Sequence, residues 1–168
     1  IIVNNAGIQH VEPIETFPDA DWESVIGINL SSAFYLTKAA LPGMKQRKWG
    51  RIINISSAHG LVASAYKSAY VAAKHGLVGL TKVTALETAE EGITANAICP
   101  GYVWTPLVQK QIPEQAKELG ISEGEVVKKV MLGQTVDGEF TSIEDVAEVA
   151  LLFAAFPSNA LTGQSLVV

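Results

Sequence analysis

The chain of 168 residues is 48% hydrophobic and 17% charged, and its formal net charge at neutral pH is -5. These values exclude a disordered or fibrous protein and predict a globular domain with a substantial core. The 12 lysines and arginines are scattered along the sequence. A net acidic chain without a basic cluster is not expected to bind nucleic acid, because nothing in it would neutralise a run of phosphates.

The cysteine content and the hydropathy of the chain indicate the cellular compartment. Cys99 is the only cysteine, which excludes an intramolecular disulfide and a cysteine-rich metal site and is typical of a reducing cytoplasm. Glu148 interrupts the best apolar stretch, so no run approaches the ~18 residues of a membrane-spanning helix. We therefore expect a cytoplasmic protein that binds neither a membrane nor nucleic acid.

Both ends of the sequence have the pattern of buried strands. The chain begins with Ile1-Ile-Val3, without a methionine, and finishes with Ser165-Leu-Val-Val168. Domain ends are usually exposed and polar. We therefore expect these residues to be a fragment of one domain that lacks its N-terminal part and its extreme C-terminus.

The first half of the chain alternates apolar strands with a helical pattern. Ile1 to Val3 is followed by Asn4-Asn-Ala-Gly7, a small-residue turn that allows the backbone to come close to a ligand. Apolar residues then recur at helical spacing from Asp21 to about Lys45, with a break near Asn29. Arg51 to Ile55 has the pattern of a second short strand.

The second half repeats this alternation. A long helix is predicted from Ala69 to Thr88, with small residues suited to close packing. A strand follows from Ile93 to Ile98, and Pro100-Gly101 ends it. Thr105 to about Met131 is polar and mixed, which predicts a helical lid or excursion outside the core.

A last helix and strand complete the pattern. Ser142 is the expected N-cap of a helix that ends near Phe156, and Leu166 to Val168 is the last strand. Strands that alternate with helices of this length predict the α/β class, with a Rossmann-like, doubly wound parallel sheet covered on both faces. No repeat or linker marks a second domain, so residues 1–168 are interpreted as a single, partial domain.

Residues suited to proton transfer cluster after the second strand. Ser57 follows the expected end of the strand, and Tyr70 and Lys74 share one face of the next helix because they are four residues apart. A phenol has a pKa of about 10, and a neighbouring ammonium stabilises the phenolate and lowers that pKa. The pair is suited to proton exchange with an alcohol or ketone whose oxygen Ser57 would bind. Taken alone, the same spacing also fits an exposed helix pair with a snorkelling lysine.

Five motifs in a fixed order resemble the short-chain dehydrogenase/reductase family, and the resemblance covers essentially the whole chain. They are Asn4-Asn-Ala-Gly7, Asn29, Ile55-Ser-Ser57, Tyr70-Val-Ala-Ala-Lys74 and Pro100-Gly101. The resemblance implies a catalytic tetrad of Asn29, Ser57, Tyr70 and Lys74. In it the tyrosine takes the hydroxyl proton, the serine steadies the oxygen, and the lysine binds the cofactor ribose and lowers the pKa of the tyrosine. The asparagine holds a water that connects the lysine to solvent.

The same resemblance implies NAD as cofactor and a homotetramer for the full-length protein. The residues that it places along the cofactor are Asn5, Ala6, Gly7, Tyr70, Lys74, Pro100, Gly101, Val103 and Thr105. The family's glycine-rich pyrophosphate-binding turn is not among the 168 residues, nor is the residue that separates NAD from NADP. About 30 residues form one strand-helix-strand unit, so we expect ~80 further residues upstream. We expect this chain by itself to bind the dinucleotide poorly.

A further set of polar residues points to the substrate. Within the family, the segments around Asn4 to His10, Ser57 to Val62, Lys67 and Thr105 to Gln111 resemble bacterial members that act on a four-carbon hydroxy acid. A small anion of this kind needs a cation and several donors that converge on one carboxylate. The resemblance assigns substrate binding to Gln9, Ser57, His59, Lys67, Tyr70 and Gln111.

Simpler interpretations of these residues stay open. Gln9 also fits a loop surface, His59 a turn, Lys67 a solvated charge and Gln111 a lid surface, and Gln109 is a weaker alternative to Gln111. His10 is interpreted as a loop or packing residue and His75 as structural. No second or third metal ligand lies at a usual spacing from these histidines, so no metal site is expected.

The resulting hypothesis is an NAD-dependent oxidoreductase that interconverts (R)-3-hydroxybutyrate and acetoacetate. Two alternatives remain at this stage. One is another enzyme of the same family, such as a 3-oxoacyl carrier-protein reductase or a sugar or polyol dehydrogenase. The other is a catalytically silent fragment that keeps the scaffold.

Overall fold

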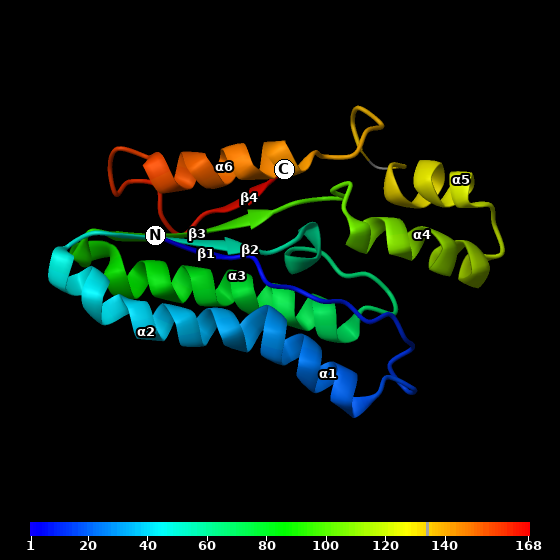
Figure 1. The fold of residues 1–168 in the computed structure, drawn as a ribbon, viewed down its shortest axis with the longest axis horizontal. Helices are drawn as coiled ribbons and strands as arrows, with labels where there is room; N and C mark the ends of the chain where they lie inside the picture. Colours follow the sequence, from blue (N-terminus) through cyan, green and yellow to red (C-terminus); the bar gives the residue numbers. More distant parts are fainter. Residues whose placement is uncertain (134) are drawn as a thin grey trace.

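The computed structural model describes residues 1–133 and 135–168, in which four parallel strands form one sheet. The strands follow the order β1-β2-β3-β4, with bounds β1 Ile2–Asn4, β2 Gly50–Ile55, β3 Ile93–Cys99 and β4 Ser165–Val167. Figure 1 shows helices on both sides of this sheet. The predicted α/β fold with a covered parallel sheet is therefore confirmed.

One face of the sheet carries helices from the first half of the chain, and the other carries the last helix (Figure 1). The first face is covered by α2 Ser32–Arg47 and α3 Ser68–Thr88, with α1 Asp19–Ile26 packed against α3, and the second by α6 Ile143–Ala155. The central strands are buried, because every residue of β3 and all but Ile55 of β2 are shielded from solvent. Strands covered on both faces are usually apolar throughout, but these two also bury polar side chains, Arg51 and Asn54 in β2 and Thr94 and Asn96 in β3.

The predicted helix break near Asn29 is confirmed as a π-helical turn. This turn, η1 Gly27–Ser31, joins α1 to α2 without an intervening loop. π-Helical turns inside longer helices often occur at functional sites. Here the turn buries Asn29, whose side chain is 2% exposed, on the side that faces the segment after β1.

A short polar ladder ties the first two strands to α3. Asn4 Nδ2 donates to Asn54 Oδ1 at 2.7 Å, and Asn54 Nδ2 donates to Thr81 Oγ1 at 2.8 Å. Thr81 Oγ1 in turn donates to the Leu77 carbonyl at 2.8 Å. Buried amides are tolerated when they are paired in this way, and such a ladder fixes the height of α3 against the sheet.

The predicted helical excursion from Thr105 to Met131 is confirmed. It consists of α4 Pro106–Leu119, α5 Glu123–Glu125 and a π-helical turn, η4 Val126–Met131. These elements bury a small core of their own, formed by Val108, Ile112, Val126 and Met131. Among the described residues, no helix is both long and apolar enough to cross a membrane.

A glycine after α3 allows the chain to turn tightly into β3. Gly92 has a φ of +71°, and a Cβ atom there would lie 2.2 Å from the Lys48 carbonyl oxygen. We expect Gly92→Ala to lower the free energy of unfolding by roughly 3 kcal/mol, because a left-handed conformation and a backbone clash add together.

The matched control for this prediction is Gly120→Ala. Gly120 has a similar φ of +66°, but no described atom lies within 4 Å of its Cβ position. We expect only about 1 kcal/mol of destabilisation there, from the left-handed conformation alone. Urea denaturation of both variants measures the difference, and equal losses would contradict the close-approach argument.

Candidate active site

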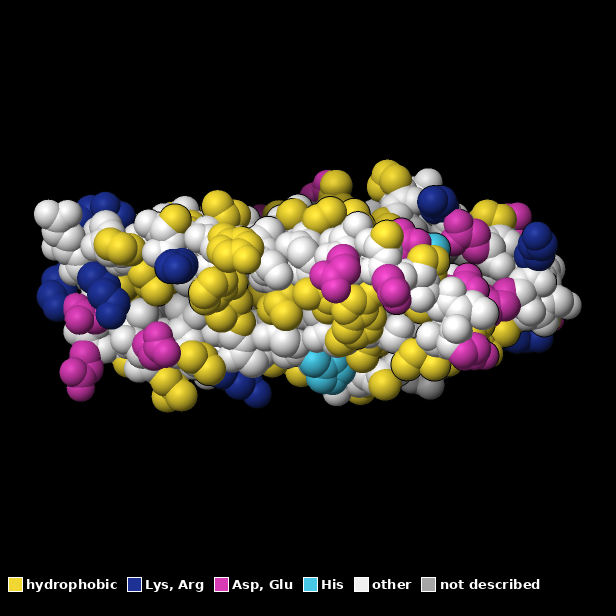
Figure 2. Space-filling model, turned by 90° about the horizontal axis from the view of Figure 1, so that it is seen from below, with side chains coloured by type: hydrophobic (Ala, Val, Ile, Leu, Met, Phe, Trp, Pro, Cys, Tyr) yellow, Lys and Arg dark blue, Asp and Glu magenta, His cyan; other side chains and the backbone are white. Residues whose placement is uncertain are grey.

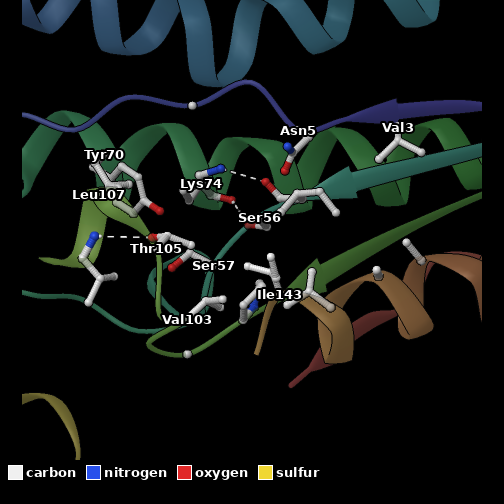
Figure 3. Close-up of a pocket in the computed structure, with 18 residues that line it drawn as sticks. Val3, Asn5, Ser56, Ser57, Tyr70, Lys74, Val103, Thr105, Leu107 and Ile143 are labelled. Carbon is white, nitrogen blue, oxygen red and sulfur yellow. Dashed lines mark hydrogen bonds between the residues drawn. The ribbon is translucent and has the colours of Figure 1, made fainter. Parts of the chain in front are cut away.

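Three segments that are distant in sequence meet at the carboxyl edge of the sheet. Asn4 pairs with Asn54 across β1 and β2, and Asn54 pairs with Ala97 across β2 and β3. The segments that follow these strands therefore emerge side by side. This is the edge at which open α/β sheets bind ligands. Figure 3 shows Asn5, Ser57 and Val103 around the space that they enclose.

Both the side chain and the backbone of Lys74 hold this residue at the edge of the sheet. Its Nζ donates to the Ile55 carbonyl at 2.7 Å, and its carbonyl accepts a hydrogen bond from Ser56 Oγ at 3.1 Å. The side chain is 4% exposed. Burial lowers the pKa of Lys74 to about 8, and Cys99 opposes this shift.

Tyr70 lies one helical turn before Lys74 and faces the same space (Figure 3). The Lys74 Nζ lies 5.6 Å from the centroid of the Tyr70 ring. Burial raises the pKa of Tyr70, and a hydrogen bond with Ser57 partly offsets this effect. The expected lowering of the tyrosine pKa is therefore not what the structure shows, because burial dominates and the net shift is upward.

Ser57 connects the strand to the next turn. Its Oγ accepts a hydrogen bond from the His59 amide at 3.1 Å and so caps the short 3₁₀ turn η2, Ala58–Gly60. The same hydroxyl lies near the Tyr70 phenol and lowers its pKa, against the larger raising effect of burial. Ser57 therefore presents its oxygen beside the phenol, as the sequence predicted.

Asn29 lies beside these residues but uses its amide for the backbone. Its Oδ1 accepts from the Ile8 amide and its Nδ2 donates to the Ile8 carbonyl, both at 2.8 Å. A Cβ atom at Gly7 would lie 3.7 Å from Asn29 Oδ1 and 3.8 Å from Lys74 Nζ. The structure thus brings Asn29 and Lys74 to the same glycine, and the water-holding role of Asn29 stays a prediction.

A cavity of about 510 Å³ opens along the carboxyl edge of the sheet. Most of the residues expected along a cofactor line it: Asn5, Gly7, Tyr70, Lys74, Pro100, Gly101, Val103 and Thr105. Ala6 belongs to the same turn, is exposed, and lies outside this lining. A cavity of this size is ordinary for a small-molecule site.

One wall of this cavity was not predicted from the sequence. It is apolar and comes from α6, with Ile143, Val146, Ala147 and Ala150. These positions follow helical i, i+3, i+4, i+7 spacing, which is the signal that could have found them.

A second cavity, of about 100 Å³, adjoins the first. All of the predicted substrate residues line it: Gln9, Ser57, His59, Lys67, Tyr70 and Gln111. Ser57 and Tyr70 line both cavities. The hydroxyl groups of these two residues therefore lie where a molecule in one cavity would meet a molecule in the other.

The smaller cavity contains an uncompensated positive charge. Lys67 is 5% exposed, and none of the ion pairs among residues 1–133 and 135–168 involves it. Burial lowers the pKa of Lys67. A buried ammonium without an acidic partner is costly, and this cost is offset when an anion binds beside it.

The two glutamine side chains in this cavity differ in whether their amide groups are free to donate a hydrogen bond to a ligand. Gln9 Nε2 is buried and has no hydrogen-bond partner within the part of the chain that the structure describes. Gln111 Nε2 donates to the Leu107 carbonyl of its own helix at 3.1 Å. Gln9 therefore offers a free donor, whereas Gln111 would exchange a bond to bind a ligand. Gln109 is exposed and does not line the cavity.

The remaining histidines have structural contacts. His10 packs edge-on against Phe17, with ring centroids 5.1 Å apart, and its Nδ1 lies 3.7 Å from Asp21. The Nδ1 of His75 contacts the Val71 carbonyl of its own helix at 3.0 Å. Both arrangements fit the packing roles expected from the sequence.

Comparison with known proteins decides the family. The family model for short chain dehydrogenases matches residues 1–116. The chain belongs to this family. The predicted family is thus confirmed, and the short-chain dehydrogenase signature spans both the turn after β1 and the residues around Tyr70 and Lys74.

Two relatives of this short-chain dehydrogenase carry the same name. The chain is 57% identical to D-beta-hydroxybutyrate dehydrogenase of Rhizobium meliloti and 55% identical to that of Cupriavidus necator, in each case over 97% of this chain. The chain spans 63% of the length of each relative. The predicted similarity to bacterial hydroxybutyrate dehydrogenases is therefore confirmed.

A solved structure gives the same fold. The chain superimposes on an actinorhodin polyketide ketoreductase variant, crystallised with NADPH, with a TM-score of 0.92 and 34% identity. The match covers 99% of this chain and 64% of the ketoreductase. Short-chain dehydrogenases with different substrates thus share this scaffold.

The folding stability of this short-chain dehydrogenase is expected to depend on pH through His59. Burial, with smaller contributions from Lys67 and His75, lowers the pKa of His59 from 6.5 to about 4. The unfolded chain therefore takes up a proton between these values that the folded chain does not, and stability falls as the pH falls through this window. We expect His59→Gln to reduce this dependence. Urea midpoints at about pH 7 and about pH 5 measure it, and parallel shifts in wild type and variant would contradict it.

Proposed function

We propose that the protein interconverts (R)-3-hydroxybutyrate and acetoacetate with NAD, using Tyr70 as the acid/base. The observation that carries this proposal is the smaller cavity, where a buried Lys67 without an acidic partner and a Gln9 amide without a hydrogen-bond partner, in both cases among the described residues, adjoin Ser57 and Tyr70. The names of the two bacterial relatives support the same substrate.

We assign the substrate carboxylate to the part of this cavity lined by Gln9, His59 and Lys67. Lys67 supplies the charge, Gln9 supplies an amide donor, and the His59 ring, which is neutral at pH 7 because burial lowers its pKa to about 4, can donate one further hydrogen bond. A four-carbon hydroxy acid bound in this way directs its hydroxyl group toward Ser57 and Tyr70. Orientation by a fixed carboxylate is a recognised source of rate acceleration.

The larger cavity suits a nicotinamide dinucleotide. The turn of Asn5 to Gly7 and the pair Pro100-Gly101 allow the backbone to come close to a ligand, and α6 adds an apolar wall. When bound there, the nicotinamide accepts or supplies the hydride. The choice of NAD over NADP rests on the resemblance to hydroxybutyrate dehydrogenases.

The chain's own residues move the proton. In oxidation, the Tyr70 phenolate accepts the hydroxyl proton of the substrate while Ser57 donates a hydrogen bond to the same oxygen. We assign to the Lys74 ammonium, whose Nζ lies 5.6 Å from the centre of the Tyr70 ring, the role of stabilising the phenolate against the opposing effect of burial. In reduction, the Tyr70 phenol returns the proton to the carbonyl oxygen.

The test uses the protein as expressed from its own gene. NADH formation is measured with (R)-3-hydroxybutyrate, its S enantiomer and the neutral methyl ester of the R acid. We expect the R acid to be turned over with the highest kcat/KM. Turnover of polyols or acyl thioesters without turnover of the acid would instead support another activity of the family, and inactivity with all substrates would support a silent fragment.

We also propose a homotetramer. Figure 2 shows hydrophobic side chains gathered on the face formed by α1, α2 and α3. They include Phe34, Tyr35 and Leu36 of α2 and Val83 and Leu86 of α3, all exposed. An apolar patch of this kind supports association between copies. Light scattering of the expressed protein measures the assembly size.

A further inference from the structure

Tyr102 lies between the small cavity and the helical excursion. It follows β3 directly after Pro100-Gly101 and lines the cavity that holds Lys67. The side chain also packs against the buried cluster of Val108, Ile112, Val126 and Met131. Its carbonyl accepts a hydrogen bond from the Thr141 amide at 3.1 Å. One side chain therefore contacts both the cavity and the packing of α4 and η4.

The ring of Tyr102 is also the aromatic partner of Lys67. The Lys67 Nζ lies 5.9 Å from the centroid of this ring. The face of an aromatic ring carries partial negative charge, and an ammonium within ~6 Å of the centroid is attracted to it. The attraction is stronger when the groups are shielded from water; Lys67 is 5% exposed and Tyr102 is half-buried.

This contact matters because the described residues provide no carboxylate for Lys67. An acidic partner would neutralise the ammonium and compete with an anionic substrate. A ring face holds the ammonium without neutralising it, so the charge stays available to a ligand. The arrangement therefore combines a fixed position with an uncompensated charge.

We propose that Tyr102 is a positioning residue for Lys67 and thereby sets the preference for an anionic substrate. The inference rests on the proposed function, because it assigns the Lys67 charge to the substrate carboxylate. It also goes further, since it links recognition of the anion to α4 and η4, whose buried cluster packs against the same tyrosine.

The first test compares substitutions at residue 102. Tyr102→Leu removes the ring, and we expect it to raise KM for (R)-3-hydroxybutyrate by roughly 3- to 30-fold. KM for the neutral methyl ester should change by less than about 2-fold. Tyr102→Phe keeps the ring face and should restore most of the apparent affinity for the acid. Equal effects of Tyr102→Leu on acid and ester would overturn the proposal.

A second test avoids any loss of packing. Phenylalanine analogues with increasing fluorination are placed at position 102, which weakens the negative ring face with little change in shape. We expect KM for the acid to rise with each added fluorine while KM for the ester stays constant. A flat series for the acid would overturn the proposal, because a role in packing alone does not depend on ring charge.

Two further variants distinguish a failure of the Tyr102 inference from a failure of the proposed function. Val127→Ala loosens the same helical cluster without lining the cavity, and it should not change the ratio of KM between acid and ester. In Lys67→Met, the effect of Tyr102→Leu on KM for the acid should disappear, since the two residues act through one interaction. If Lys67→Met itself leaves KM for the acid unchanged, the anionic cavity and the proposed function fail. If only the residue 102 variants are without effect, the inference on Tyr102 fails alone.

Discussion

Tyr70→Phe is expected to lower kcat for oxidation of (R)-3-hydroxybutyrate by about 10²- to 10⁴-fold, the usual contribution of a positioned acid/base. The substitution removes only the phenol oxygen. The ring, the cavity walls and the Lys67 charge remain, so KM for the acid should change little. Steady-state NADH formation gives both constants.

Tyr66→Phe is the matched control for this experiment. Tyr66 lies in the loop just before α3, the helix that carries Tyr70, but it is 49% exposed and lines neither cavity. We expect its kcat to match that of the wild type. Retention of kcat within a few-fold by Tyr70→Phe would show that another group transfers the proton, while equal losses in both variants would point to a disturbed loop.

The direction of the Tyr70 pKa shift adds a pH dependence to this prediction. Burial raises the pKa of Tyr70 in the structure, so the phenol is mostly protonated at neutral pH. Oxidation needs the phenolate and should accelerate as the pH rises, whereas reduction needs the phenol and should be favoured at lower pH. Rate profiles for the two directions, measured on the same protein, should therefore have opposite slopes.

Lys67→Met is expected to raise KM for (R)-3-hydroxybutyrate by about 10- to 150-fold, which is the range for losing a hydrogen bond to a charged group. Methionine keeps an unbranched apolar stem but removes the ammonium. The neutral methyl ester should be affected much less, because it lacks the carboxylate that the lysine binds. Alkaline pH should also weaken binding of the acid, since burial lowers the pKa of Lys67 and favours its uncharged form.

The same substitution should increase stability. A buried ammonium without an acidic partner opposes folding, so its removal is expected to raise the urea midpoint while binding is lost. Lys110→Met is the control, because Lys110 is exposed on α4 and does not line the cavity. It should leave both KM and the urea midpoint near the wild-type values. A Lys67→Met protein with an unchanged ratio of KM between acid and ester would contradict the anionic site.

Local patterns predicted the order and type of the main elements. The apolar strand before Ser57 and the helix that carries Tyr70 and Lys74 both lie where the sequence places them. The break near Asn29 was also visible in the pattern, although its form as a π-helical turn was not. These features depend on residues close together in the chain, which explains why they could be predicted.

Features that depend on contacts between distant residues could not be predicted from the sequence. The apolar wall formed by Ile143, Val146 and Ala150 needs the placement of α6 against the sheet. The hydrogen bond from Lys74 to the Ile55 carbonyl follows from how deeply the helix packs against the sheet. The raised pKa of Tyr70 follows from its burial, which only the folded structure gives. The contact of Lys67 with the Tyr102 ring joins a loop after η2 to a loop after β3.

The sequence by itself determined which side chains could exchange a proton and that they lie on neighbouring elements, because helical spacing relates Tyr70 to Lys74 and the end of a strand precedes Ser57. Only the tertiary structure decided that Gln9, Lys67 and Tyr102 meet at one small cavity beside these hydroxyl groups. The reason is geometric: the carboxyl ends of parallel strands lie at one edge of the sheet, so loops far apart in the chain converge there, and burial at that edge then sets the charges of the groups that they bring.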